Sequence, residues 1–275
     1  MAVFISPIYW FDAFQLLGPE SPAGNEHVMS YLNTRLNDVK TVWQLLVSRI
    51  DGQTHTERLN SFYQGQAVGY DQFRKRLLHG RCELFESLPV SAGDIWVDLG
   101  TGTGENAELW GQRLQQFQRA YLVDLCQPLL DVCSQRISDR GWPNVSAVCH
   151  DATSFTPPES HVDLVTFSYS LTMIPDWFQA VNHAWDLLRP GGMLGIVDFY
   201  VSRKYPPHNL QSHGWFQRNF WPVWFAGDNV FLNSDHLPYL LDRFELISLN
   251  ESQGSLPFLP FLKVPFYSLI AKKPL

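Results

Sequence analysis

The sequence predicts an α/β fold: a doubly wound, mostly parallel sheet with an antiparallel C-terminal edge strand, a helical N-terminal cap and an inserted lid. From residue 94 onward, short apolar strands alternate with helices, a pattern typical of parallel sheets covered on both faces. A glycine-rich turn, "GTGTG", follows the first of these strands. The 275 residues are 45% hydrophobic and 17% charged, which is ample for one large core with an appendage.

The first ninety residues predict the helical cap. Within residues 27–50, apolar side chains recur at every third or fourth position, which places them on one face of a helix. A second helical stretch ends before Pro89. We therefore expect the cap over residues 1–90 and the sheet domain over residues 91–275.

Strands and helices then alternate along the sheet domain. The expected strands are 95–100, 119–125, 145–152, 162–171 and 193–200, and the expected helices are 106–117, 128–141 and 177–192. Residues 201–240 interrupt this alternation with prolines, tryptophans and histidines, so we assign them to the lid. Two further apolar stretches, 243–252 and 266–273, predict the last strands, an antiparallel pair at the edge of the sheet.

The glycine turn predicts a nucleotide-like ligand in a Rossmann-like fold. A dinucleotide-binding turn has the spacing G-x-G-x-x-G, whereas Gly100, Gly102 and Gly104 are spaced G-x-G-x-G. Asp98 comes two residues before the first glycine. A carboxylate is unfavourable beside a phosphate but favourable beside a sulfonium or an ammonium group. The pattern therefore favours a cationic cofactor over a dinucleotide.

Carboxylates also close the next two strands. Asp124 ends the second strand, where it can accept both ribose hydroxyls, although folds that bind NAD place an acid there too. Asp151 ends the third strand, where it can bind an adenine amino group or cap the following turn. The candidate cofactor-binding residues are Asp98, Gly100, Thr101, Gly102, Gly104, Asp124, Leu125, Asp151, Ala152, Ser168 and Tyr70.

These acids and glycines, with "LLRPGG" before the last parallel strand, resemble the class I S-adenosylmethionine-dependent methyltransferases over about residues 90–200. The motifs "FYQGQAVGYDQFRKRLLHGR" (62–81), "TFSYSLTMIPDW" (166–177), "GIVDFYVS" (195–202) and "FWPVWFAGDNVFLNSDHLPYL" (220–240) further resemble the BtaB-type methyltransferases of betaine lipid synthases. This resemblance implies S-adenosylmethionine as the cofactor and N-methylation of diacylglyceryl-homoserine to diacylglyceryl-trimethylhomoserine. It also implies a partner that transfers the 3-amino-3-carboxypropyl group onto diacylglycerol.

The catalytic candidates lie where ligands bind in open α/β sheets, beyond the carboxyl ends of the strands. They are Tyr169 after the fourth strand, Asp198 and Tyr200 at the end of the fifth, and His213 in the lid. Packing, loop capping and a structural histidine are the competing interpretations of Tyr169, Asp198 and His213. Methyl transfer needs mainly alignment and exclusion of water, and aromatic faces hold a quaternary ammonium product. The aromatic stretch 220–225 suits such a cage, a membrane anchor or the core of the lid.

Composition excludes several classes of protein. A net charge of −7 argues against a nucleic-acid surface. The four cysteines form no CxxC pair, so neither a disulfide framework nor a zinc site is expected. The apolar N-terminus has no basic segment typical of a signal peptide, and we expect a cytoplasmic protein. An aromatic content of 14% leaves peripheral membrane contact open.

Two alternatives remain at this point. One is a class I methyltransferase for another small apolar or lipid acceptor, such as a quinone, a phosphatidylethanolamine or a free amine. The other is a non-catalytic subunit that binds S-adenosylmethionine.

Overall fold

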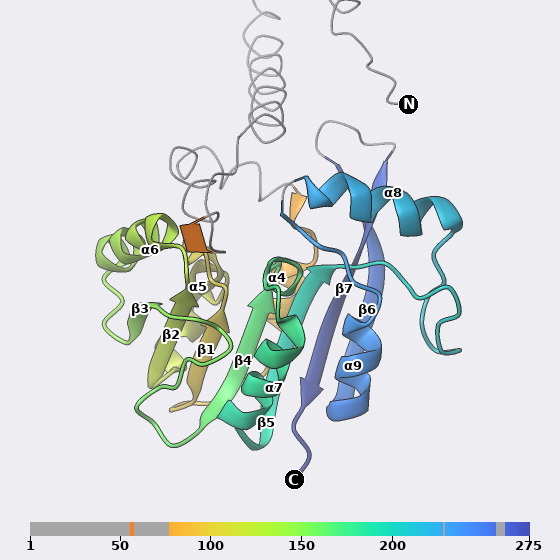
Figure 1. Cartoon of the computed structure of the whole chain (residues 1–275). Coiled ribbons are helices and arrows are strands. Elements are labelled where there is room, and N and C mark those ends of the chain that lie inside the picture. Colours follow the sequence, from red (N-terminus) through yellow and green to blue (C-terminus); the bar gives the residue numbers. More distant parts are fainter. Residues whose placement is uncertain (1–55, 58–76, 228, 257–261) are drawn as a thin grey trace, which may run out of the picture.

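The structure is a computed structural model, and it describes residues 56–57, 77–227, 229–256 and 262–275. Its centre is a seven-stranded sheet of order β3-β2-β1-β4-β5-β7-β6 (Figure 1). The strands are β1 Ile95–Leu99, β2 Arg119–Asp124, β3 Val145–Cys149, β4 Val162–Ser168, β5 Leu188–Phe199, β6 Glu245–Ser255 and β7 Lys263–Lys272. The helices are α4 Arg81–Ser87, α5 Glu105–Leu109, η3 Gly111–Gln116, α6 Gln127–Arg140, η4 Leu171–Met173, α7 Trp177–Leu187, α8 Trp215–Ala226 and α9 His236–Arg243.

The predicted fold class is confirmed. Strands β1 to β5 pair in parallel, and the strand order reverses between β1 and β4, which is where open α/β sheets bind their ligands. The C-terminal strand β7 is antiparallel to both of its neighbours, as expected, but it lies between β5 and β6 rather than at the edge. The apolar β7 is mostly buried and the polar β6 is mostly exposed. The apolar strand therefore occupies the interior position, and the polar strand lies at the edge of the sheet.

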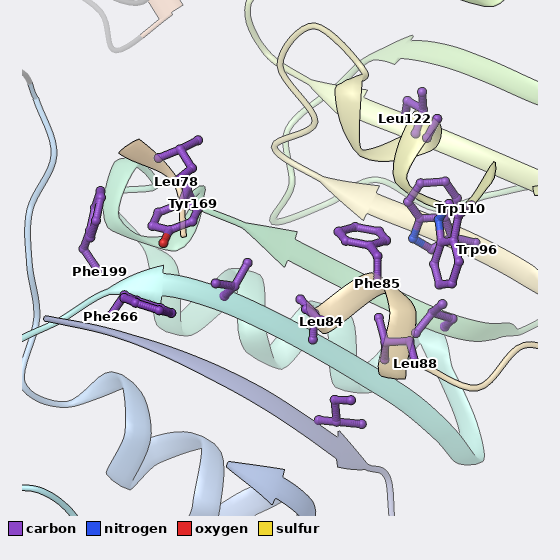
Figure 2. Close-up of a cluster of buried hydrophobic side chains, with 14 of the residues drawn as sticks. Leu78, Leu84, Phe85, Leu88, Trp96, Trp110, Leu122, Tyr169, Phe199 and Phe266 are labelled. Atoms are coloured by element: carbon purple, nitrogen blue, oxygen red, sulfur yellow. The ribbon is translucent and has the colours of Figure 1, made fainter. Parts of the chain in front are cut away.

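Helices cover both faces of the sheet and make two hydrophobic cores. Side chains alternate between the two faces along a strand. On β1, Trp96 therefore joins the core under α4, α5 and α6, and Val97 joins the core under α7 and α9. In the first core, Phe85 from α4 packs edge-on against Trp96 and Trp110 (Figure 2). This packing makes α4, the described helix of the predicted cap, part of the same core as the sheet.

Two predicted helices are shorter in the structure. The helix expected over 106–117 is divided into α5 and η3, and Gly111 at the division has a φ of +55°. The helix expected over 177–192 ends at Leu187. Pro190 disfavours helical backbone at Arg189, the residue before it, and Leu188 is already extended, so β5 begins there. The first 55 residues of the cap, and residues 58–76 with the candidate Tyr70, lie outside the described residues.

The predicted lid contains α8 and the beginning of α9. Helix α8 lies beyond the carboxyl ends of the parallel strands, at the top of Figure 1. Its Phe225 packs on Phe199, whose ring centroid is 4.9 Å away at the end of β5. Among the helices that the structure describes, none is long and apolar enough to cross a membrane.

Candidate cofactor and acceptor site

A cavity opens at the carboxyl ends of the first four strands. The loops after β1, β2, β3 and β4 all line it. The predicted site residues that line it are Gly100, Gly102, Asp124, Leu125, Asp151, Ala152 and Tyr169. The sequence analysis did not select other lining residues, namely Thr56, Cys126, Leu129, His150, Thr153, Ser170, Met173, Ile174, Pro175 and Asp176. Three of these, Cys126, Thr153 and Ser170, directly follow a selected residue, and His150 directly precedes one, so extending each motif by one residue would have found these four.

The glycine turn after β1 requires glycine for conformation and for space. Gly100, Gly102 and Gly104 have φ values of +78°, +59° and +72°, in the left-handed region that side chains disfavour. A β-carbon on Gly100 would overlap the β-carbon of Ser170, which is held in place because its Oγ donates a hydrogen bond of 2.7 Å to the Leu99 carbonyl. The turn can therefore fold tightly against the end of β4. Gly104 begins α5 and does not line the cavity.

Asp124 joins the turns after β1 and β2. Its Oδ2 accepts a hydrogen bond from the Gly102 amide at 2.8 Å, and its Oδ1 accepts one from the Cys126 amide at 2.9 Å. These two bonds fix the plane of a carboxylate that lines the cavity. A fixed carboxylate with two oxygens is suited to a vicinal diol such as a ribose.

Asp151 both lines the cavity and closes a turn. Its Oδ1 accepts hydrogen bonds from the Thr153 amide at 2.8 Å and from the Thr153 hydroxyl at 2.7 Å. Its carbonyl accepts bonds from the Ser154 and Phe155 amides. The two interpretations of this residue are therefore compatible, since the turn that Asp151 caps also presents it to the cavity.

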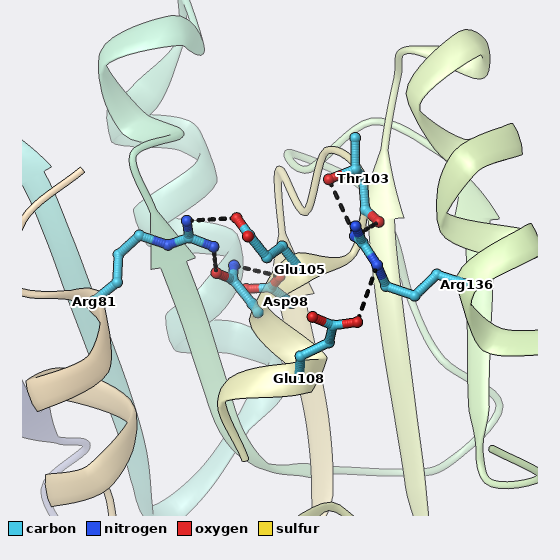
Figure 3. A network of polar contacts seen from close by, with 7 residues as sticks. Arg81, Asp98, Thr103, Glu105, Glu108 and Arg136 are labelled. Carbon is cyan, nitrogen blue, oxygen red and sulfur yellow. Dashed lines mark hydrogen bonds and ion pairs between the residues drawn. The ribbon is translucent and has the colours of Figure 1, made fainter. Parts of the chain in front are cut away.

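Asp98 lies buried beneath the glycine turn and does not line the cavity. Its carboxylate accepts hydrogen bonds from Thr166 Oγ1 at 2.5 Å and from Asn106 Nδ2 at 2.9 Å. Arg81 from α4 in turn donates to Asn106 and forms an ion pair of 2.8 Å with Glu105 (Figure 3). Burial raises the pKa of Asp98, and its hydrogen bonds oppose that rise. This network ties α4 and α5 to the turn.

Tyr169 lines the cavity, and its side chain is buried with its hydroxyl already hydrogen-bonded. Its φ of +56° is rare for an aromatic residue, and it immediately follows β4. The hydroxyl donates a hydrogen bond of 2.6 Å to the His79 carbonyl, and burial raises its pKa well above the ordinary value. The ring packs on Phe199 at 4.6 Å. Tyr169 therefore lines the cavity without a free hydroxyl, and its ring is part of the core beside Phe199.

The other three catalytic candidates do not line the cavity. Burial raises the pKa of Asp198 to about 7, and its carboxylate is bonded to Thr172. The Tyr200 hydroxyl donates to Glu251 at 2.5 Å, and burial raises its pKa. His213 Nδ1 accepts a bond from the Ser202 amide at 3.0 Å, and burial lowers its pKa to about 4.

Two cofactor candidates also lie beside the cavity without lining it. Thr101 is buried in the turn, where its amide donates to the Val123 carbonyl at 3.0 Å, and Ser168 is buried at the end of β4.

The side chains that line the cavity have a negative net charge. Asp124, Asp151 and Asp176 line it, and none of its described lining residues is a lysine or an arginine. Such a surface attracts cationic ligands and repels phosphates. Together with the glycine turn, it fits S-adenosylmethionine, which carries a sulfonium, an ammonium, a ribose and an adenine.

Comparison with known proteins agrees with this geometry. Residues 97–192 match the family model described as a methyltransferase domain. The ubiquinone/menaquinone biosynthesis C-methyltransferase UbiE of Pseudomonas putida is 24% identical over 196 residues, which cover 69% of this chain and 75% of that protein. The chain is an S-adenosylmethionine-dependent methyltransferase.

Another relative and two solved structures agree with the fold. The UbiE protein of Hydrogenovibrio crunogenus is 26% identical to this chain, and the match covers 64% of this chain and 70% of that protein. A phosphoethanolamine N-methyltransferase from Haemonchus contortus, solved with phosphomonomethylethanolamine and S-adenosylhomocysteine, has a TM-score of 0.61 and 14% identity. The match covers 82% of this chain and 61% of that one. The YcgJ protein of Bacillus subtilis has a TM-score of 0.58 and 15% identity, over 72% of this chain and 99% of that one.

Proposed function

We propose that this methyltransferase N-methylates a lipid-borne amine, with diacylglyceryl-homoserine as acceptor and the trimethylated betaine lipid as product. The observation that carries this proposal is that Tyr169 and Asp176 line the same cavity. An aromatic face and a carboxylate are the groups that hold a methylated ammonium. The motifs over 166–177 and 220–240, which resemble betaine lipid synthases, support the same acceptor.

The cavity divides between cofactor and acceptor. The turns after β1, β2 and β3 supply the glycines, Asp124 and Asp151, which suit the amino acid, ribose and adenine parts of the cofactor. The segment after β4 supplies Tyr169 and Met173 to Asp176, which suit the acceptor. This wall combines one aromatic ring, three apolar side chains and one carboxylate.

The residues present suit an in-line displacement. When bound, S-adenosylmethionine supplies an electrophilic methyl group on a sulfonium sulfur. The amine lone pair forms the new nitrogen–carbon bond as the carbon–sulfur bond breaks, and that bond's electrons remain on sulfur. The amine must lose a proton before each transfer, so water must have access between turnovers. Asp176 and the Tyr169 ring align the amine, which is the main requirement of this reaction.

C-methylation of a quinone precursor is the second candidate. The two UbiE relatives are named for this activity. The lining side chains Leu129, Met173, Ile174 and Pro175 give the cavity apolar surface that suits a flat aromatic ring. Both candidates have a lipid-soluble acceptor.

Purified full-length protein with S-adenosylmethionine tests the proposal. We expect mass spectrometry to detect a gain of three methyl groups on diacylglyceryl-homoserine and none on phosphatidylethanolamine. An Asp124→Ala variant is the negative control, because Asp124 lies on the cofactor side. Methylation of a reduced quinone precursor, with diacylglyceryl-homoserine left unchanged, would overturn the first candidate in favour of the second.

A further inference from the structure

Helix α8 carries apolar side chains on both of its faces. Trp221 and Phe225 are buried against the domain, whereas Trp215 is 73% exposed and Val223 is 78% exposed. Arg218 is the one charged residue among the twelve of the helix. A surface helix of a globular protein normally has a polar outer face, and a helix that is apolar all round is typical of burial or of a membrane environment.

The outer face of α8 consists of Trp215, Asn219, Val223 and Ala226, which are three or four residues apart and all exposed. Asn219, its polar member, donates a hydrogen bond of 2.7 Å from Nδ2 to the Trp215 carbonyl of the same helix. Its amide is thus partly satisfied within the helix, which reduces the free-energy cost of removing this face from water.

The charge around α8 differs from that of the rest of the chain. Residues 201–240 contain three basic residues, Arg203, Lys204 and Arg218, and two acidic ones, Asp228 and Asp235, so their net charge is +1. The whole chain carries −7. An anionic bilayer therefore repels most of this protein but not the lid.

The inner face of α8 leads to the cavity. The Phe225 ring lies 4.9 Å from the Phe199 ring, which lies 4.6 Å from the Tyr169 ring of the cavity wall. Beyond the helix, the Phe231 amide donates a hydrogen bond of 2.7 Å to the Thr172 carbonyl, next to Met173 of the same wall. A surface on which α8 rests is therefore close to the acceptor side of the site (Figure 1).

We propose that the outer face of α8 binds an anionic lipid bilayer, from which the methyltransferase takes its acceptor. Tryptophan and small apolar side chains enter the interface between headgroups and acyl chains, and the exposed Lys204 of the lid contacts the headgroups, whereas Arg203 is paired with Asp235 at 2.7 Å. This inference rests on the proposed function in one respect only, that the acceptor is a lipid; it holds equally for the amine and the quinone.

Vesicle flotation with the full-length protein tests the proposal, without cofactor or acceptor. The vesicles are phosphatidylcholine alone or phosphatidylcholine with phosphatidylglycerol. We expect the protein to float with the anionic vesicles, and Trp215→Ser/Val223→Ser to lower its partition coefficient about tenfold or more. Ile247→Ser is the control, because Ile247 is an apolar side chain that is 54% exposed but lies on the edge strand β6. It should float like the wild type.

Three results would overturn the proposal. The first is equal flotation of the wild type and the double variant. The second is a lower melting temperature of the double variant, which would show that the chain itself covers this face. The third is a dimer that becomes a monomer in the double variant during sedimentation without vesicles. Methylation of a detergent-dispersed acceptor is measured separately. If the proposed function is wrong, the protein still floats with anionic vesicles but does not methylate the acceptor.

Discussion

Asp198 and Thr172 are joined by two hydrogen bonds, from Thr172 Oγ1 at 2.8 Å and from the Thr172 amide at 3.1 Å. Asp198 lies at the end of β5, and Thr172 lies in η4, immediately before the cavity wall of Met173 to Asp176. The Thr172 carbonyl accepts the bond from Phe231 of the lid. A buried acid that does not touch the cavity therefore positions both the cavity wall and the lid.

Removing this acid should alter acceptor binding more than cofactor binding. Asp198→Ala leaves the buried amides of Thr172 and Phe199 without their acceptor, which should lower the free energy of unfolding by about 2–4 kcal/mol. We expect a higher KM for the acceptor and an unchanged Kd for S-adenosylmethionine, with partial recovery in Asp198→Asn. Chemical denaturation and steady-state kinetics measure these effects. In a cycle with Thr172→Val, additive losses would contradict the coupling.

The stability of the protein should depend on the ionisation of Asp198. Burial raises its pKa from 3.8 to about 7, so the folded state binds a proton that the unfolded state has released between these values. The stabilising contribution of protonated Asp198 to the free energy of unfolding is fully present below pH 3.8 and is lost as the pH rises through about 7. Relative to Asp198→Asn, the wild type should lose up to about 4 kcal/mol of unfolding free energy over this range.

Urea unfolding of the two proteins at several pH values checks this prediction. The buried histidines, His213 and His236, are common to both proteins, so their own titration cancels in the difference. A difference that stays constant from pH 4 to pH 8, or that grows as the pH rises, would contradict it.

Asp124 should contribute directly to cofactor affinity. We expect Asp124→Ala to raise the Kd for S-adenosylmethionine by about 10- to 100-fold, because a charged hydrogen-bond acceptor is worth about 1.5–3 kcal/mol. Asp131→Ala is the control, since Asp131 is an exposed acid on α6 that accepts a bond from Gln127. Calorimetric titration measures both variants. Equal affinities in the two would exclude Asp124 from the cofactor site.

The distance along the chain between a residue and its partners explains which site residues could be predicted from the sequence. Asp124 and Asp151 each lie at a strand end and accept a hydrogen bond from an amide two residues further on, although Asp124 also accepts one from Gly102, 22 residues away. Asp198 and Tyr200 also end a strand, but their partners Thr172 and Glu251 are 26 and 51 residues away. Those hydrogen bonds engage two side chains that do not line the cavity, and no local pattern encodes them.

The same distinction holds for the fold. The alternation of apolar strands and helices predicted the parallel sheet, because each βα unit is encoded locally. The position of β7 between β5 and β6 depends on which of the last two strands buries more apolar surface, a comparison between segments. The interruption at Gly111 was visible in the sequence, since a glycine inside a helical pattern lowers helix propensity.

Tyr169 should act through its ring and not through its hydroxyl. Because the hydroxyl is bonded to the His79 carbonyl, Tyr169→Phe should retain kcat and lose about 1 kcal/mol of stability. Tyr169→Ala removes the aromatic ring and should lower kcat/KM for the acceptor by about tenfold. Parallel kinetics on both variants separate the two roles. A large loss of kcat in Tyr169→Phe, with normal folding, would instead make the hydroxyl catalytic.

The last prediction separates two reasons for a glycine with a positive φ. Gly100 and Gly141 have φ values of +78° and +62°, but only Gly100 faces a neighbour, Ser170, at the position where a β-carbon would stand. Gly141→Ala should therefore lose only about 1–2 kcal/mol from backbone strain. Gly100→Ala should lose about 1–3 kcal/mol more from overlap, and should bind S-adenosylmethionine poorly.

Ser170→Gly should restore part of the stability of Gly100→Ala, since it removes the atom that the new methyl group meets. The recovery stays incomplete, because the variant loses the hydrogen bond from Ser170 Oγ to Leu99 and keeps the backbone strain. Thermal unfolding of the three variants and of the Gly100→Ala/Ser170→Gly pair provides the comparison. If Gly100→Ala were no less stable than Gly141→Ala, the close approach of the glycine turn to the end of β4 would be excluded as the reason for glycine at this position.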